Sequence, residues 1–287
     1  MGIRTFFLTF AVEMKHFLCF LLLCSSILVQ AQSYQEYVKM AMDALQKDSL
    51  DQAEAFFRKA LEKDPAIKSN AILFDYIGQI QERRGELKEA LESYSLAHNI
   101  SPTTLSVLLN RASLYMRMDN EKRALVDYND VLDLNADHPE ALFFRAYIYM
   151  QEHNYKQARA DYEHLIRLEP NNVKAQLGLV LLNDKDNRPR EAMEQMNALI
   201  QLYPNQAQLY ATRAGMEQER QQHEVALHDF NKAIELEPTN ADYYIARGTY
   251  FLSMKKKKLA KADFTQAVKY GADEKEVAAL LNEYSNK

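Results

Sequence analysis

The chain has 287 residues, with 40 acidic and 35 basic side chains and a formal net charge of −5 at pH 7. This mildly acidic balance excludes the positive electrostatic footprint of a general nucleic-acid-binding protein. Only 7 glycines and 7 prolines are present and 47% of the residues are hydrophobic, a composition that favours an all-helical fold and gives no sign of strands.

The N-terminal segment, residues 1–31, is similar to a secretory signal peptide. Lys15 gives a short charged start, residues 17–29 are mostly apolar, and the stretch that ends at Ala31 has the pattern of a cleavage site. Met14 is a candidate for the true start codon, because a complete-looking signal begins there. The sequence therefore predicts an exported protein.

Two other interpretations of this segment stay open. An uncleaved anchor is disfavoured because the apolar run is shorter than the roughly 20 residues that a spanning helix needs. A lipoprotein acylated at Cys24 is disfavoured because Leu23, and not a small residue, precedes that cysteine. Cys19 and Cys24 are the only cysteines, so the mature chain has none and can form no disulfide.

We expect a periplasmic or cell-envelope protein of a Gram-negative bacterium. The alternatives are a lipoprotein, a signal-anchored protein and a eukaryotic secretory protein. Once the signal is cleaved, the sequence predicts no stable membrane span.

From Tyr34 on, the sequence repeats itself with a period of 34 residues. Six copies follow one another without a gap, and a seventh precedes them with three extra residues in between. Repeats 1 to 7 are predicted to be residues 34–67, 71–104, 105–138, 139–172, 173–206, 207–240 and 241–274.

Each repeat carries an alanine and, four residues later, a large side chain. The alanines are Ala53, Ala90, Ala124, Ala158, Ala192, Ala226 and Ala260. The large residues are Phe57, Tyr94, Tyr128, Tyr162, Met196, Phe230 and Phe264. Residues four apart lie on one face of a helix, where the alanine lets a neighbouring helix approach and the large side chain fills the gap.

A second apolar-periodic stretch precedes each of these helices. Twelve residues before the alanine stands another small residue, except in repeat 5: Ala41, Gly78, Ala112, Ala146, Val180, Ala214 and Gly248. Five repeats end with a proline, which stops one helix before the next begins: Pro65, Pro102, Pro170, Pro204 and Pro238. Each repeat is therefore predicted to contain two helices.

On these residues the chain resembles the tetratricopeptide repeat family. In repeat 4 the positions that match the family's signature are Leu142, Ala146, Tyr149, Ala158, Tyr162 and Pro170. The resemblance implies an all-α, right-handed superhelical solenoid of about seven helix-turn-helix repeats, with the first helices on the concave face. Residues 275–287 are predicted to contain a capping helix, because Val277, Leu280, Leu281 and Tyr284 share one helical face.

Four repeats share a pair of charged residues. An arginine immediately precedes the small residue of the first helix, and an aspartate immediately precedes the large residue of the second. We predict structural ion pairs between Arg111 and Asp127, Arg145 and Asp161, Arg213 and Asp229, and Arg247 and Asp263. A coincidence on two solvated faces stays an alternative.

The family resemblance places partner contacts at the fifth, sixth and ninth residues of each repeat. These positions are largely apolar and aromatic in repeats 3 to 5, as in a groove that holds a peptide segment. The candidate groove residues are Leu109, Asn110, Ser113, Phe143, Tyr147, Lys174, Leu177 and Leu181. The alternative is that several of these side chains pack between repeats, and nearby Phe144 is the first candidate for the core.

The sequence offers no convincing catalytic, metal or cofactor site. His223 and His228 imitate a zinc motif, but five steps of about 100° place them on different helix faces. We therefore expect a non-catalytic interaction scaffold of the cell envelope, without metal or cofactor, that binds a protein or peptide segment in the concave groove. The alternatives are a structural or self-assembling solenoid and an accessory subunit of a cell-envelope enzyme complex. No nucleic-acid partner is expected.

Overall fold

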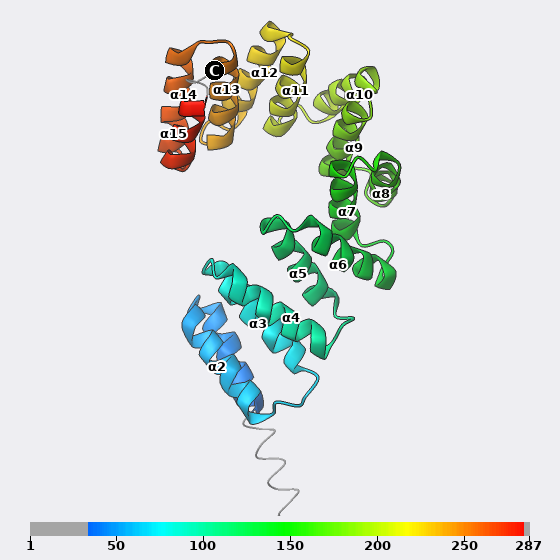
Figure 1. Ribbon diagram of the computed structural model, residues 1–287, viewed down its shortest axis with the longest axis vertical. Helices are drawn as coiled ribbons and strands as arrows, with labels where there is room; N and C mark the ends of the chain where they lie inside the picture. The colour runs from blue at the N-terminus through cyan, green and yellow to red at the C-terminus, as the bar shows by residue number, and fades with distance from the viewer. Residues whose placement is uncertain (1–33, 284–287) are drawn as a thin grey trace, which may run out of the picture. The chain divides into compact units, whose positions relative to one another are not determined.

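The computed structural model describes residues 34–283, and within this range all regular structure is α-helical (Figure 1). Helical residues 34–46 are followed by α2 (Leu50–Lys63), α3 (Asn70–Arg83), α4 (Leu87–Ile100), α5 (Leu105–Arg117), α6 (Glu121–Leu134), α7 (Pro139–Gln151), α8 (Tyr155–Leu168), α9 (Val173–Lys185), α10 (Pro189–Leu202), α11 (Ala207–Glu219), α12 (His223–Leu236), α13 (Ala241–Ser253), α14 (Lys257–Lys269) and α15 (Glu274–Glu283). The all-α prediction is confirmed. The predicted signal peptide and Tyr284 lie outside the described residues.

The helices form two compact units that divide between Arg145 and Ala146, inside α7. In the first unit, α3 packs against α4 and α5 against α6, while α4 also contacts α5. In the second unit the pairs are α9 with α10, α11 with α12, and α13 with α14. The helix α15 packs against α13 and α14, where the capping helix was expected. Consecutive helix pairs of this kind are the building unit of the expected solenoid.

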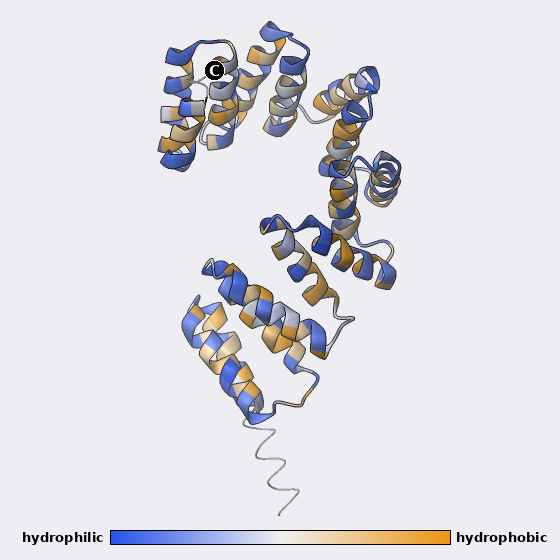
Figure 2. Ribbon diagram, viewed as in Figure 1, coloured by the Kyte–Doolittle hydropathy of each residue, from blue (hydrophilic) through white to orange (hydrophobic). Residues whose placement is uncertain are grey.

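The repeating alanine and the large residue after it are buried in every repeat. All seven alanines are 0% exposed, and none of the seven large side chains exceeds 3% exposure. Figure 2 shows that hydrophobic and hydrophilic residues alternate along the helices, as amphipathic helices require. Burying one large apolar side chain contributes about 1.5–3 kcal/mol, so this position is a main source of stability in each repeat.

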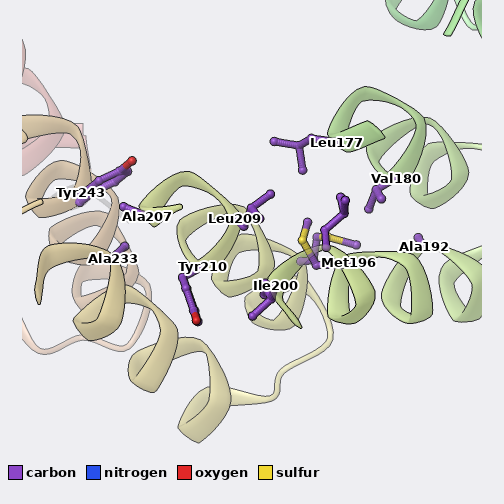
Figure 3. Packing of buried hydrophobic residues seen from close by; sticks show 12 residues of the cluster. Leu177, Val180, Ala192, Met196, Ile200, Ala207, Leu209, Tyr210, Ala233 and Tyr243 are labelled. Carbon is purple, nitrogen blue, oxygen red and sulfur yellow. The ribbon is translucent and has the colours of Figure 1, made fainter. Parts of the chain in front are cut away.

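The small residue of the first helix is needed because a ring lies directly against it. An added Cβ at Gly248 would lie 2.7 Å from Cε1 of Phe264, closer than real carbon atoms approach. Repeat 5 solves the same packing problem differently, because Val180 there faces the flexible side chain of Met196 within one buried cluster (Figure 3). Valine is therefore tolerated where the partner has no ring.

The turn between the two helices has the same backbone conformation in all seven repeats. The fifteenth residue of each repeat lies in this turn and has a φ between 55° and 80°. These residues are Asp48, Gly85, Asp119, His153, Asn187, Gln221 and Lys255. The next N–H donates to the carbonyl five residues earlier, for example from Asn120 to Tyr115 at 2.8 Å. This hydrogen bond closes a Schellman-type helix end. Glycine, the usual residue for it, occurs only once among these turns, so the sequence pattern did not reveal the motif.

Candidate functional site

Three of the four predicted ion pairs are present among the described contacts, and each is bidentate. The arginine Nε donates to Oδ2 at 2.7–2.8 Å and Nη2 donates to Oδ1 at 2.6–2.8 Å. The pairs are Arg111–Asp127, Arg213–Asp229 and Arg247–Asp263. The aspartates are at most 5% exposed, so the pairs belong to the architecture. Arg145 and Asp161 lie on either side of the division between the units, and their pairing stays a prediction.

Two of these arginines also contact the preceding repeat. Nη1 of Arg213 donates to Oδ1 of Asn197 at 2.8 Å, and Nη1 of Arg247 donates to Asn231 at 2.6 Å. Each asparagine directly follows the large residue of its repeat. One guanidinium therefore joins the two helices of its own repeat to the repeat before it. The asparagine after the large residue could have indicated this contact in the sequence.

Repeats 2 and 5 lack the ion pair and satisfy the same position with an amide. In repeat 2 the hydroxyl of Ser93 donates to Gln81 at 2.7 Å. In repeat 5, Nδ2 of Asn183 donates to Oε1 of Gln195 at 2.8 Å. Ser93 and Gln195 occupy the aspartate position, so a neutral pair replaces the charged one.

The candidate groove residues of the first unit are half-buried. Leu109, Asn110 and Ser113 lie on α5, and Phe143 lies on α7. The rings of Phe143 and Phe144 meet edge to face at 5.3 Å, and Phe144 stacks on buried Tyr128 at 5.6 Å. Phe144 therefore joins the core side of α7, as the packing alternative proposed.

The candidates of the second unit differ in exposure. Lys174 is exposed and Tyr147 is half-buried. Leu177 is only 5% exposed and belongs to the buried cluster around Met196 (Figure 3). Leu181 packs against the same cluster. Leu177 is a core residue and not part of an open groove. The prediction that Leu177 lines the groove is wrong, because the packing of the adjacent repeat buries this side chain.

A polar pocket of about 320 Å³ opens in the first unit, between α3, α4 and α5. It is lined by Gln79, Glu82, Arg83, Tyr94, Asn110, Ser113 and Arg117. Two candidate groove residues, Asn110 and Ser113, are thus brought together with side chains that sequence reasoning did not select.

Charged and phenolic groups in the lining of this pocket contact one another. Arg117 forms an ion pair with Glu82, and the Tyr94 hydroxyl donates to Oε2 of Glu82 at 3.0 Å. Burial, together with the neighbouring Glu82 carboxylate, raises the pKa of Tyr94 far above its ordinary value. Tyr94 therefore remains a hydrogen-bond donor, and Glu82 is held by a cation and a hydroxyl at once.

A buried carboxylate contacts two residues that line this pocket. Asp75 on α3 is 4% exposed, and it accepts hydrogen bonds from Nδ2 of Asn110 at 2.8 Å and from Nε2 of Gln79 at 3.2 Å. Within the described residues no cation pairs with it. Burial raises the pKa of Asp75, against the opposing effect of hydrogen bonds from Asn110, Ser106 and Gln79.

Sequence reasoning missed Asp75 and Gln79, although their positions could have identified them. They are the fifth and ninth residues of repeat 2, two of the positions that the family resemblance assigns to partner contacts. The sequence-based search concentrated on apolar residues of repeats 3 to 5. Polar residues at the fifth and ninth positions of repeat 2 would have indicated a polar site there.

The raised pKa of Asp75 predicts an effect on stability. Between the pKa of the unfolded chain and that of the folded protein, the folded state binds more protons, so this group makes the protein more stable as the pH falls. At neutral pH its buried charge is unfavourable. We therefore expect Asp75→Asn to raise the midpoint of thermal unfolding at pH 7, and the gain should shrink as the pH is lowered through the folded-state pKa.

Thermal unfolding followed by circular dichroism between pH 7 and about pH 4 measures this difference. The matched control is Asp133→Asn on α6, which neutralises an exposed carboxylate and should leave the midpoint nearly unchanged. A variant at Asp75 that is less stable than the wild type at pH 7 contradicts the expectation.

The described residues contain neither a candidate membrane span nor a candidate metal site. None of their helices has the length and apolar character needed to cross a membrane. In the same part of the chain, no group of three or more His, Cys, Asp or Glu side chains is placed to hold a metal ion.

Comparisons with known proteins agree with the helix-pair architecture. Sequence models of the tetratricopeptide repeat match residues 38–102, 105–138 and 139–172. A solved tetratricopeptide repeat protein from Parabacteroides merdae is 32% identical, with a TM-score of 0.82, over 88% of this chain and 99% of that chain.

Two more distant structures share the fold alone. They are PilF of Pseudomonas aeruginosa, at 19% identity and a TM-score of 0.56 over 75% of this chain and 96% of that one, and a MamA fragment from Desulfovibrio magneticus, at 13% identity and a TM-score of 0.55 over 61% and 97%. No curated protein matches the chain.

Proposed function

Because the chain belongs to the tetratricopeptide repeat family, we propose that it is a non-catalytic scaffold that binds a segment of a partner protein on the face formed by α3 and α5. Proteins built from these repeats are in general protein–protein interaction scaffolds. The observation that carries the finer proposal is the polar pocket of about 320 Å³ on this face.

The chemistry of the lining suits a peptide segment outside regular secondary structure. Each residue of such a segment offers one N–H and one C=O that need partners. The side-chain amides of Gln79 and Asn110 and the hydroxyl of Ser113 can bond with groups of this kind. The ion pair of Glu82 with Arg117 supports one wall of the pocket, so the surface is largely formed before a ligand arrives.

Other candidate groove residues extend the proposed surface within each unit. In the first unit, Leu109 and Phe143 offer partly exposed apolar area. Leu109 lies on α5, which also lines the polar pocket, and Phe143 lies on α7. In the second unit, Tyr147, Lys174 and Leu181 form a separate candidate patch. We propose that these patches add contacts of the mixed apolar and polar kind that peptide grooves use.

We further propose that the scaffold acts in the cell envelope after export. The support is the signal-like segment that ends at Ala31 and the lack of cysteine after it. The partner is then a protein of the same compartment. A role as an accessory subunit of an envelope enzyme complex is one form of this proposal.

The test compares two variants that place an arginine in the same unit, one inside the pocket and one outside it. Ser113→Arg fills the pocket, whereas Val126→Arg changes an exposed residue of α6, which is 57% exposed. The protein is purified from the cell envelope of the producing organism, and the proteins that accompany it are identified by mass spectrometry. We expect Ser113→Arg to lose a specific partner by tenfold or more (roughly 1.4 kcal/mol), while Val126→Arg retains it.

A synthetic segment of that partner should then bind the wild type and compete with the whole protein. The same set of accompanying proteins with both variants excludes the α3–α5 face as the binding site. If the protein instead forms concentration-dependent oligomers that Ser113→Arg leaves intact, a self-assembling structural role replaces the scaffold.

A further inference from the structure

We infer that the α3–α5 pocket recognises a basic side chain, lysine or arginine, in the bound segment, and that Asp75 is the positioning residue that prepares the pocket for it. This inference rests on the proposed function, because it names the chemistry of the partner at that site. It follows from how one buried carboxylate orients two neighbouring amides.

An ionised carboxylate can accept hydrogen bonds but cannot donate them. Asn110 and Gln79 must therefore both turn their NH₂ groups toward Asp75, as the contacts of 2.8 and 3.2 Å show. Their carbonyl oxygens are then left to face other partners. In the described part of the chain neither oxygen has a hydrogen-bond donor, and neither is fully enclosed.

The two amides consequently present hydrogen-bond acceptors to the pocket. Without the carboxylate, each amide could present either its NH₂ group or its oxygen. Asn110 and Gln79 line the pocket from α5 and α3, so their oxygens come from two different repeats. A ligand that bonds to these two oxygens must bring N–H groups. An ammonium group supplies three and a guanidinium five, all on a positive charge.

The charges around the pocket favour the same ligand. Glu82 is compensated by Arg117, and Arg83 by Asp48. Asp75 alone has no cation among its contacts in the described residues, although it is 96% removed from solvent. A basic side chain that bonds the two amide oxygens would place its charge close to this carboxylate and stabilise the ionised form.

An acidic group is disfavoured for the same reasons. A carboxylate placed against Asn110 and Gln79 would meet two carbonyl oxygens and the negative charge of Asp75. Like charges and unpaired acceptors both work against binding. The pocket should therefore discriminate by the sign of the ligand's charge as well as by its shape.

The experiment selects ligands from a library of random peptides displayed on phage, with the purified full-length protein as the target. We expect the selected peptides to share a lysine or arginine at one fixed position. Replacing that residue with norleucine in a synthetic peptide should weaken binding by roughly tenfold to a hundredfold. Replacing it with glutamate should abolish binding.

Asp75→Asn tests the positioning role directly. Asparagine has nearly the same shape but one N–H₂ group, so a neighbouring amide can turn its oxygen inward and present its NH₂ to the ligand. We expect this variant to bind the lysine peptide and the norleucine peptide with equal affinity. A role of Asp75 in stability alone would change the affinity for both peptides by the same factor and leave their ratio unchanged, and Asp133→Asn should leave that ratio as in the wild type.

The outcomes separate this inference from the proposed function. Peptides that bind the wild type, lose binding to Ser113→Arg and show no preference for a basic residue overturn the inference and leave the scaffold intact. An unchanged preference in Asp75→Asn overturns the positioning role. If no selected peptide depends on Ser113, the proposed binding face itself is wrong. The lysine and norleucine peptides are compared on the wild-type protein, so this test does not depend on the folding of any variant.

Discussion

Replacing Arg213 with leucine should lower the free energy of unfolding by about 3–5 kcal/mol, because it leaves a buried carboxylate without its cation. Asp229 is 0% exposed and accepts two hydrogen bonds from Arg213, at 2.7 and 2.8 Å. The arginine also donates to Asn197 of the preceding repeat at 2.8 Å, so its loss weakens the junction between repeats 5 and 6. Urea denaturation followed by circular dichroism measures the effect.

The chain itself provides the rescue for this variant. At the corresponding positions repeat 5 has Leu179, Gln195 and Asn183, and the two amides bond to each other at 2.8 Å. Copying this set into repeat 6 gives Arg213→Leu, Asp229→Gln and Glu217→Asn together. We expect the triple variant to recover most of the lost stability, because no buried charge remains. A triple variant as unstable as Arg213→Leu alone would show that the ion pair cannot be replaced in this way.

The second large effect is expected from Gly248→Val, which should lower the free energy of unfolding by about 3 kcal/mol. The new Cβ would lie 2.7 Å from Cε1 of Phe264, and the ring is only 2% exposed, so it has little room to move. The packed core resists such overfilling because its side chains already occupy low-energy positions. The midpoint of thermal unfolding is the measurement.

Two further variants show whether the clash is the cause. Gly215→Val is the matched control on α11, because an added Cβ there meets nothing within 4 Å. It should cost less than about 1 kcal/mol. The double variant Gly248→Val with Phe264→Met copies Val180 and Met196 of repeat 5 and should recover much of the loss. Equal destabilisation by both glycine substitutions would point to the backbone and not to the ring.

The periodic parts of this fold could be predicted from the sequence because each repeat serves as a reference for the others. Ala158 and Tyr162, four residues apart, are buried together as their spacing indicates. The Arg–Asp pairs were predictable for the same reason. Arginine and aspartate occur together or are both absent, and such joint occurrence indicates contact.

Other features depend on a neighbouring repeat and could not be predicted in this way. Gly178 of repeat 5 gives space to Tyr162 of repeat 4, since an added Cβ would lie 2.5 Å from that ring. Leu177 is buried for a similar reason, although its position matches the expected groove. The turn residues were also hidden, because Lys255 and Gln221 adopt a backbone conformation that usually signals glycine.

The candidate site was only partly predictable. Asn110 and Ser113 were identified by their places in repeat 3, but the pocket also needs Gln79 and Glu82 from repeat 2. Asp75 has the largest proposed influence on this pocket and is itself 4% exposed. Its position in repeat 2 could have marked it as a candidate, but its burial and its hydrogen bond with Asn110 of repeat 3 arise only when the two repeats pack.

The turn with positive φ has a consequence for how such a gene can change. All seven copies enter and leave the turn with the same backbone conformation and the same closing hydrogen bond, whichever side chain stands there. A recombination event between two of these turns would join the first helix of one repeat to the second helix of another without altering the local path of the chain. The protein could therefore gain or lose 34 residues at a time, and its length would be free to follow the length of its partner.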